Sequence, residues 1–467
     1  MSNAPVLVLQ MQRMGDLVMT FPLLGWLARH FPGHPVWTIA EPRFFTALCK
    51  LAPQTVFFPP EAYPRMRTTR FRCIINLSHR PDAAHMAGTL GAEQRFGAHT
   101  RGDATYIDGD WSLYRASIVH NNRHNLFHWS DLQLLEHVAS QPLPHQPSCP
   151  APAKDKDSIG LFVGASEAGK RPNPQFWGEL AQRLLRKGFR PFFLGGPDDV
   201  ALGAASQQAA GIPGSNLCGR FSVGELAEVM STLALCITPD TGPMHLAAWM
   251  NTPVLNLSLG NVHPWETGPV PPGHHVLRPR ISCAGCWRCH HATLRCHQAF
   301  HPGRVALLVH TLLRQPQRLP QLFLPGLEVY RTARESRGLY RLTPMHGTPA
   351  TPRMLLAHFW QEWFWERKYG RNCSALPHIL KDLTSAAPAL PEHLQRAVLR
   401  MEQAISRQLG GRSPELVDAS FWNHYPPLLR AFTGHLQLRL QNQDFSAAAW
   451  KTALHDVELL ADVVRQA

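Results

Sequence analysis

The sequence predicts an α/β protein with parallel sheets in two similar halves, followed by a helical tail. Three observations indicate this fold class. Short apolar runs alternate with helical segments over about residues 5–315, which is typical of parallel strands joined by crossover helices. The same pattern starts again after a proline-rich, linker-like stretch at residues 142–157. From about residue 322 the alternation stops and helical periodicity replaces it.

The first half opens with a buried strand at residues 6–9, a glycine turn, and a helical segment with apolar spacing. Further buried strands are expected at residues 36–39 and 73–77, separated by stretches long enough for crossovers. Asp16 therefore lies on a turn at the end of the first strand.

The second half repeats this order of elements. We expect strands at residues 158–163, 190–194, 233–238 and 253–258, and helices at residues 175–188 and 223–232. Ligands of such folds bind at the carboxyl ends of the strands. Three groups of residues fall at such ends: Asp16, the pair Gly195 and Gly196, and residues 240–245.

One turn between an apolar, β-rich run and the start of a helix is the most informative stretch of the chain. Asp240 and Thr241 are suited to cap the helix, Gly242 permits a sharp bend, and Pro243 suits the first helical position. Free N–H groups and a partial positive charge at this end favour a phosphate, and His245 could point at the same anion. A capped turn without any ligand has the same pattern and stays an alternative.

The tail is expected to be a helical appendage. Helices are predicted at residues 353–368, 393–409, 427–440 and 445–466. An aromatic cluster in the first of them is interpreted as the core of the appendage, with an exposed interface as the alternative. The cluster comprises Phe359, Trp360, Trp363, Phe364 and Trp365.

Composition limits the class of protein. At 467 residues the chain is long enough for two or three domains, and no apolar run reaches the roughly 18–20 residues that span a bilayer. The N-terminus lacks a signal-type segment, so we expect a cytoplasmic protein whose ten cysteines are mostly reduced. A net charge of +13 with 26 further histidines predicts an anionic partner.

Four blocks of sequence, in order, resemble glycosyltransferase family 9, the heptosyltransferases of lipopolysaccharide synthesis. Met14-Gly15-Asp16 with Thr20-Phe-Pro22 is similar to the segment that opens the family, and Asp240-Thr-Gly-Pro-Met-His-Leu-Ala-Ala248 with Thr252-Pro253 is similar to its second signature. Residues 164–171 before Phe176-Trp177, and residues 194–199, match the two blocks between. The resemblance covers about residues 5–315, and the tail has no counterpart.

The resemblance implies two Rossmann-like domains that face each other across a cleft, the GT-B fold, here with a C-terminal helical appendage. It implies an acceptor domain at residues 1–150 and a nucleotide-sugar donor domain at residues 151–320. The appendage would then comprise residues 321–467.

The resemblance also implies roles for individual residues. Asp16 corresponds to the family's general base, with a helix N-cap as the alternative. Lys170 matches the lysine expected near the donor phosphates, although a solvated surface lysine would look the same. The backbone N–H groups of Thr241, Gly242 and Met244 would bind the diphosphate, with no metal or other cofactor required for the transfer.

The remaining donor contacts are less specific. Asp199 falls where the family often has a ribose-binding glutamate, and Asp198 competes for that role. Asp240 would hold a sugar hydroxyl or serve only as a cap. The donor-binding set is completed by Gly15, Ser166, Gly195, Gly196, Pro243 and His245.

Four cysteines within 14 residues form a second constellation: Cys283, Cys286, Cys289 and Cys296. In the cytosol such clustering favours a metal over disulfides, and iron, zinc or an iron–sulfur cluster are the candidates. Unmetallated structural thiols are the alternative. Any metal here is expected to be structural, because glycosyl transfer needs no redox step.

The leading hypothesis is an inverting glycosyltransferase that moves a sugar, with heptose favoured, from an ADP-sugar to an acceptor hydroxyl of lipopolysaccharide core or another surface glycan. An alternative acceptor is a serine of an adhesin or flagellar protein. A nucleic-acid-binding protein with a four-cysteine zinc site, and a scaffold without catalysis, are alternatives from other classes. Dispersed basic residues argue against nucleic acid, and the charge is compatible with peripheral binding to the inner face of an anionic membrane. Acceptor selection is expected around His79, Arg80 and residues 95–101.

Overall fold

The computed structural model of the protein describes residues 3–138, 142–144, 154–287, 289–347, 350–370, 375–410 and 419–465. The chain divides into two compact units, of which the first comprises Met1–Arg72 with His128–Thr348 and the second Cys73–Phe127 with Pro349–Ala467. The predicted boundary at residues 150–151 lies outside the described residues, so the limits 1–150, 151–320 and 321–467 stay predictions.

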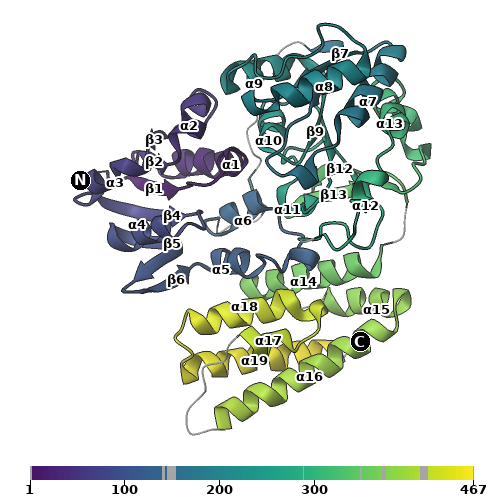
Figure 1. The fold of residues 1–467 in the computed structure, drawn as a ribbon. Helices are drawn as coiled ribbons and strands as arrows, with labels where there is room; N and C mark the ends of the chain where they lie inside the picture. The colour runs from purple at the N-terminus through teal and green to yellow at the C-terminus, as the bar shows by residue number, and fades with distance from the viewer. Residues whose placement is uncertain are drawn as a thin grey trace. The chain divides into compact units, whose positions relative to one another are not determined.

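The first sheet has the strand order β3-β2-β1-β4-β5-β6 (Figure 1). Its strands are β1 (Val6–Leu9), β2 (Val36–Ile39), β3 (Val56–Phe58), β4 (Arg70–Asn76), β5 (Gly91–Arg101) and β6 (Ala104–Asp108). β1 and β2 pair in parallel, as the sequence predicts, and β3, which it does not predict, pairs in parallel with β2. β5 and β6 form an antiparallel hairpin that the sequence does not predict either. The helix α1 (Met14–His30) follows β1, and α2 (Pro42–Leu48) and α3 (Tyr63–Met66) complete this part of the first unit.

The second sheet belongs to the first unit and has the order β13-β12-β11-β10-β9-β7-β8. Five of its strands pair in parallel with their neighbours: β7 (Asp155–Phe162), β8 (Arg190–Leu194), β9 (Leu233–Pro239), β10 (Val254–Leu257) and β11 (His275–Pro279). These confirm the predicted strands of the second half. Two mixed α/β sheets of this kind, with the helices around them, form the two Rossmann-like parts of the fold.

The expectation that all residues after about 322 are helical is wrong for the first of them. β12 (Leu327–Arg334) pairs antiparallel with β11, and β13 (Tyr340–Pro344) pairs antiparallel with β12. The hairpin therefore extends the second sheet. β12 is a strand because it pairs with β11, about fifty residues earlier in the chain. The local periodicity of the sequence cannot predict such a distant pairing.

The helices of the second half are held by local capping and by burial of one face. In α7 (Pro174–Arg186) the side chain of Asn173 accepts a hydrogen bond from the Phe176 N–H at 2.8 Å, which satisfies one free donor of the first turn. The buried face of α7 carries Trp177, Leu180 and Leu184 into the core beside the sheet. The other helices here are α6 (Trp129–Leu135), α8 (Val200–Ala210), α9 (Val223–Thr232), α10 (Gly242–Trp249), α11 (Pro264–Thr267), α12 (Arg295–Gln298) and α13 (Pro302–Arg314).

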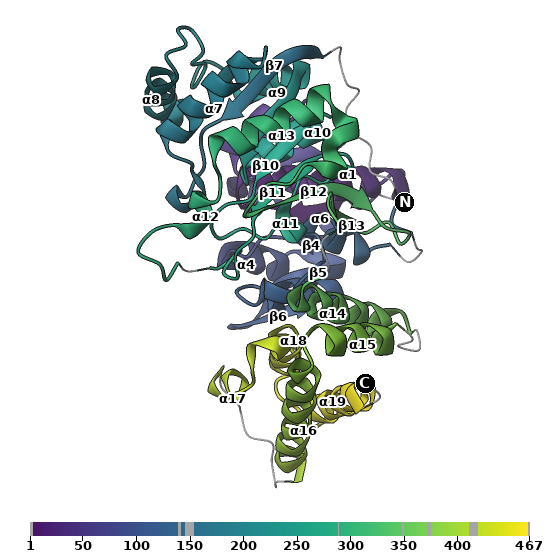
Figure 2. The same cartoon turned by 90° about the vertical axis from the view of Figure 1, so that its right-hand side faces the viewer.

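The second unit combines β5, β6 and two helices of the first half with the helices of the tail (Figures 1 and 2). The helices are α4 (Pro81–Thr89), α5 (Asp110–Ser117), α14 (Pro352–Tyr369), α15 (Leu376–Ala386), α16 (Ala389–Gly410), α17 (Ala419–Asn423), α18 (Arg430–Gln441) and α19 (Ala447–Arg465). Tyr106 on β6 donates a hydrogen bond to Asp444 at 2.9 Å, and α18 packs beside α5. The tail is therefore part of the same compact unit as this segment of the first half.

The aromatic cluster of α14 forms the core of the tail, as the sequence predicts. All five of its side chains are buried, and Trp360 stacks on Phe432 of α18 with ring centroids 5.9 Å apart. The Trp360 indole N–H donates to the backbone of Leu428, so its polar edge is satisfied as well. No helix in the described ranges is long and apolar enough to cross a membrane.

Candidate active site

Two glycines allow the N-terminal ends of α1 and α10 to touch. A Cβ atom at Gly15 would lie 3.0 Å from Cδ2 of His245, and one at Gly242 would lie 3.2 Å from the backbone nitrogen of Gly15. Side chains at either position would push the helices apart. The two helix ends, each with the partial positive charge of a helix N-terminus, therefore converge.

Asp16 stands in the first turn of α1, close to this contact. Its carboxylate accepts a hydrogen bond from the backbone N–H of Arg13 at 3.2 Å, as expected for an acidic residue that closes a helix start. Its negative charge also acts on His245. Arg13, and not Asp16, occupies the N-cap position, so the N-cap alternative for Asp16 is wrong. Asp16 instead stabilises the helix start from within its first turn, and it lies where α1 meets α10.

His245 is a buried imidazole with an unsatisfied nitrogen. Its side chain is 6% exposed, and no described group bonds its Nδ1 atom. Burial lowers the pKa of His245 to about 4, the charge of Asp16 opposes this shift, and the charge of Lys170 adds to it. The ring is therefore neutral at neutral pH and keeps one nitrogen free to bond a ligand.

Lys170 belongs to a charged cluster centred on Glu167. The Lys170 Nζ atom lies 3.6 Å from Oε1 of Glu167, and Arg13 approaches the same oxygen to 3.2 Å. Asn261 donates to the other carboxylate oxygen at 2.8 Å, and Arg13 also donates to the hydroxyl of Ser166 at 3.3 Å. The cluster thus joins the turn after β1 to the loop after β7.

Glu167 is held ionised in this cluster. Burial would raise its pKa, but the hydrogen bond from Asn261 and the charges of Lys170 and Arg13 outweigh that effect and lower it. The sequence did not single out Glu167, Arg13 or Asn261. Glu167 lies inside one quoted family block and Arg13 directly precedes another, whereas no sequence signal indicated Asn261.

Asp240 does not cap α10. Its carboxylate accepts a hydrogen bond from the Thr267 hydroxyl at 2.6 Å, and Thr241 occupies the N-cap position without a side-chain cap bond. Burial raises the pKa of Asp240, while the charge of Lys170 and the bond from Thr267 lower it. The capping interpretation of Asp240 is therefore wrong, and its carboxylate instead faces Lys170 and Thr267.

The backbone of the α10 turn differs in one respect from the expected phosphate cradle. The N–H group of Met244 already donates to the carbonyl of Thr241 at 3.0 Å, and Met244 is fully buried. Met244 is therefore not a free donor. Pro243, as predicted, occupies the first turn of the helix.

Asp199 lies over the carboxyl ends of β7 and β8. Its Oδ2 atom accepts the Gly196 N–H at 2.9 Å, and a Cβ atom at Gly164 would lie only 2.0 Å from the same oxygen. Gly195 likewise leaves room for the Asp199 side chain. Burial raises the pKa of Asp199, while the bond from Gly196 and the charge of Arg171 lower it. Of the two competing aspartates, Asp199 is the one at the strand ends, and Asp198 is exposed.

The four clustered cysteines are neighbours but are not arranged around an ion. Burial and the nearby thiols of the other three raise the pKa of Cys286. Within the described ranges, no three His, Cys, Asp or Glu side chains converge in a way that could hold a metal. As they stand, these side chains do not form a metal site, and the metal stays a prediction. The segment instead touches the loop of Lys170, since Nε2 of His297 lies 2.8 Å from the carbonyl oxygen of Gly169.

The residues expected to select the acceptor lie in the second unit. Arg95 bonds the backbone carbonyls of Ala87 and Leu90 at the end of α4, and Arg80 pairs with Asp82. These two arginines are engaged in local structure. Their role toward an acceptor stays a prediction.

Comparison with known proteins identifies relatives of the chain. The profile of glycosyltransferase family 9 (heptosyltransferase) matches residues 65–295. The sequence is 27% identical over 160 residues to lipopolysaccharide heptosyltransferase 1 of Pseudomonas aeruginosa, covering 31% of this chain and 44% of that protein. It is 26% identical over 131 residues to lipooligosaccharide heptosyltransferase 2 of Haemophilus influenzae, covering 27% and 37%. The chain thus spans less than half the length of these relatives.

Solved structures show the same fold. A family 9 glycosyltransferase of Veillonella parvula superposes with a TM-score of 0.53 at 18% identity, covering 67% of this chain and 98% of that one. The ADP-heptose lipopolysaccharide heptosyltransferase II of E. coli gives a TM-score of 0.53 at 19% identity, covering 67% and 99%. At these identities the likeness concerns the fold alone.

Proposed function

Since the chain is a heptosyltransferase-like protein of glycosyltransferase family 9, we propose that it transfers a sugar from a nucleotide-sugar donor to an acceptor hydroxyl with inversion. One observation carries the proposal. The starts of α1 and α10 converge through Gly15 and Gly242, beside the Asp16 carboxylate and within electrostatic range of Lys170. A base and an anion-stabilising surface are the two parts that this chemistry needs.

In the proposed reaction Asp16 takes the proton of the acceptor hydroxyl. The acceptor oxygen forms a bond to the anomeric carbon as the bond from that carbon to the diphosphate breaks on the opposite face. The leaving diphosphate keeps the electron pair. Lys170 and the N-terminus of α10 stabilise its growing negative charge, which is the usual function of fixed charges and helix dipoles at such positions.

His245 and Asp240 have supporting roles in this proposal. The neutral His245 ring offers its free Nδ1 position to a phosphate oxygen or to the acceptor. Asp240, bonded to Thr267 and near Lys170, accepts a hydrogen bond from a donor sugar hydroxyl. In this proposal the carboxylate of Asp199, which lies at the ends of β7 and β8, accepts a hydrogen bond from a ribose hydroxyl of the nucleotide.

For the donor sugar we propose heptose carried on ADP, and for the acceptor a lipopolysaccharide-type glycan, because the sequence relatives are heptosyltransferases of such glycans. A serine of a surface protein is the alternative acceptor. Nucleic-acid binding is less well supported, since the family match falls on a sugar-transfer fold. The charge of +13 supports peripheral binding to the inner face of an anionic membrane.

The test is a panel of nucleotide sugars incubated with the full chain, with release of free nucleotide as the readout. We expect ADP-heptose to give the fastest release once a lipopolysaccharide core acceptor is added. Release from another donor would correct the sugar. Nucleotide release from no donor, together with tight binding of oligonucleotides at physiological salt, would overturn the proposal in favour of the nucleic-acid alternative.

A further inference from the structure

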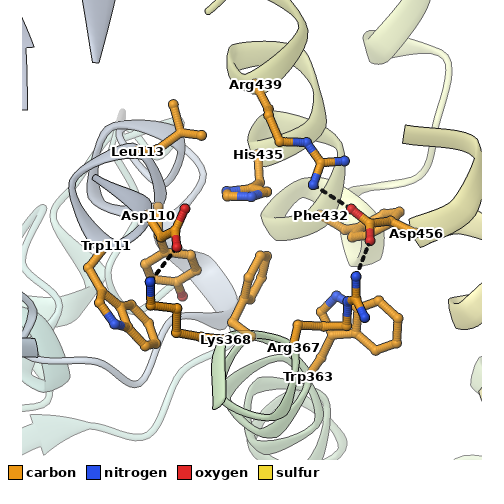
Figure 3. Close-up of a pocket in the computed structure, with 12 residues that line it drawn as sticks. Asp110, Trp111, Leu113, Trp363, Arg367, Lys368, Phe432, His435, Arg439 and Asp456 are labelled. Atoms are coloured by element: carbon orange, nitrogen blue, oxygen red, sulfur yellow. Dashed lines mark hydrogen bonds and ion pairs between the residues drawn. The ribbon is translucent and has the colours of Figure 1, made fainter. Parts of the chain in front are cut away.

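A cavity of about 160 Å³ lies within the second unit, where α5 meets the tail helices (Figure 3). Its walls come from α5 of the first half of the chain and from the tail helices α14, α18 and α19. The aromatic part of the lining consists of Trp111, Tyr114, Trp363, Phe364 and Phe432. The candidate active site uses none of these residues.

Charged side chains stand on two sides of this cavity. Lys368 pairs with Asp110 on one side, and Arg367 and Arg439 both pair with Asp456 on the other (Figure 3). His435 lies between the two groups (Figure 3). The lining thus carries three cationic side chains against two carboxylates, so one positive charge has no matching negative charge.

Asp456 is the carboxylate that is shared. Arg367 approaches its Oδ1 atom to 2.6 Å and Arg439 its Oδ2 atom to 2.5 Å, and the Asp456 side chain is only 7% exposed. A single buried carboxylate therefore serves two guanidinium groups. Leaving a buried charge only partly compensated is costly unless another group supplies the missing partner.

Two buried nitrogen atoms of the lining lack a hydrogen-bond partner among the described residues. They are Nη2 of Arg439 and Nδ1 of His435. Buried polar groups in folded proteins are almost always bonded, to protein, water or a ligand. Both atoms belong to neighbouring turns of α18, and so one ligand group could satisfy both.

We propose that this cavity binds a small anionic ligand in which a carboxylate or phosphate group is carried on a single sugar-sized ring. The anion would pair with Arg439, whose planar guanidinium suits carboxylate and phosphate oxygens. The ring would pack on the aromatic walls, as ligands commonly do in pockets that combine apolar sides with few polar groups. The volume, below the roughly 300–1,000 Å³ of pockets for drug-sized molecules, limits the ligand to about one ring.

The proposal is tested on the full chain by calorimetry with four probes. Glucuronate and glucose 6-phosphate carry the ring and the anion, glucose carries only the ring, and inorganic phosphate carries only the anion. We expect saturable binding of one or both of the first two, with glucose and phosphate much weaker. Binding of glucuronate alone would identify a carboxylate ligand, and binding of glucose 6-phosphate alone a phosphate ligand. Absence of saturable binding for both would overturn the proposal.

Variants locate the site. Arg439→Gln should weaken binding by about ten- to a hundredfold, the usual effect of losing a charge-assisted hydrogen bond. Arg407→Gln removes the same charge from an exposed position of α16 and should leave binding unchanged. Equal losses in both variants would indicate a non-specific effect of charge and would overturn the proposal.

Two further variants keep the test decisive. If Arg439→Gln does not fold, Arg439→Lys retains a positive charge beside Asp456 but lacks the planar fork, and it should weaken binding as well. Lys170→Ala, in the candidate active site of the other unit, should bind these probes as the wild type does. Loss of binding in Lys170→Ala with retention in the Arg439 variants would assign the ligand to the active site and overturn the proposal.

Discussion

Asp16 combines two roles at the start of α1 that a pair of substitutions can separate. Asp16→Ala removes both the proposed base and the acceptor of the Arg13 N–H bond, so turnover should fall by about 10²–10⁴ and stability by about 1 kcal/mol. Asp16→Asn keeps an acceptor oxygen but not the basicity, so its melting temperature should stay near that of the wild type while turnover still falls. Rates and melting curves on the same samples decide. Full turnover in Asp16→Asn would restrict Asp16 to its helix role.

Lys170 is the residue whose charge reaches Glu167, Asp240 and His245. Lys170→Ala should weaken ADP binding by about ten- to a hundredfold, because a charge-assisted bond to a phosphate contributes about 1.5–3 kcal/mol. Calorimetry measures this directly. Lys187→Ala, at an exposed position in the same half, is the matched control and should bind ADP as the wild type does. An unchanged affinity in Lys170→Ala would remove this residue from the donor site.

Much of the site was predictable residue by residue, and the remainder has a physical reason. Asp16 in the first turn of α1, Lys170 after β7 and Asp240 after β9 all follow strands, as the sequence predicts, and their roles in the reaction stay predictions. The network of Arg13, Glu167 and Asn261 was not predictable, because its members lie about 150 and 90 residues apart and meet only through tertiary packing. The free N–H of Met244 was predicted wrongly, since the pattern of a helix start does not show which donors the first turn itself uses.

At the scale of elements, the contact of α1 with α10 depends on the absence of side chains. In Gly15→Ala the new Cβ atom would lie 3.0 Å from His245, so the helix ends should separate and turnover should fall on the order of ten- to a hundredfold through misplacement of Asp16. Gly25→Ala is the control in the same helix. Its Cβ atom meets only ordinary contacts at 3.6 Å, so stability should rise by about 0.5–1 kcal/mol with turnover unchanged. Equal turnover in the two variants would show that the close approach is not required.

For the cysteine segment, the sequence predicts a metal site, whereas the described residues of the structure do not form one. Four thiols within 14 residues predict a metal, yet the described side chains do not converge on one. The raised pKa of Cys286, to which the other three thiols contribute, shows that the four lie within electrostatic range of one another. We therefore expect elemental analysis of anaerobically purified protein to find about one iron or zinc per chain, or a cluster, with Cys286→Ser lowering both metal content and melting temperature. Cys49→Ser, at an exposed site elsewhere, should change neither. Metal-free protein with full stability would leave the four as ordinary thiols.

Elements whose identity is set locally were predicted, and those set by distant pairing were not. The tail helices α14, α16, α18 and α19 follow from apolar periodicity and from the aromatic stripe of α14, which is buried as expected. The helices α15 and α17 were not predicted. The strands β12 and β13 were missed because they exist through antiparallel pairing with β11. The hairpin of β5 and β6 was missed because most residues of β5 are exposed or half-buried. The strand therefore lacks the apolar run of a buried strand.

At the scale of the whole molecule, buried histidines predict loss of stability in mild acid. Burial lowers the pKa of several histidines that are at most 7% exposed, among them His124, His128, His245 and His274. Burial, as the main cause, lowers the pKa to about 4 for His124 and His245 and to about 3 for His274, and places that of His128 well below 6.5. As the pH is lowered, these histidines therefore become protonated at a higher pH in the unfolded chain than in the folded protein.

The difference between the folded and unfolded pKa values determines how the free energy of unfolding changes with pH. Between about pH 6.5 and pH 4 the unfolded histidines are charged while the folded ones stay neutral, so the free energy of unfolding falls as the pH falls. Each buried histidine contributes about 1.4 kcal/mol per pH unit in that range. The urea midpoint should thus decrease steeply from pH 7.5 to pH 5.

Single variants attribute this slope to particular side chains. His274→Asn removes one titrating group. Its amide oxygen can still accept the Val254 N–H, which bonds the His274 ring at 3.2 Å in the wild type. The slope of the free energy of unfolding against pH should therefore decrease by about 1.4 kcal/mol per pH unit, the value for one proton. His455→Asn, at an exposed position of α19, is the matched control and should leave the slope unchanged. Urea unfolding at several pH values between 7.5 and 5 measures all three proteins. A wild-type midpoint that does not change over this range would show that these histidines are protonated in the folded state.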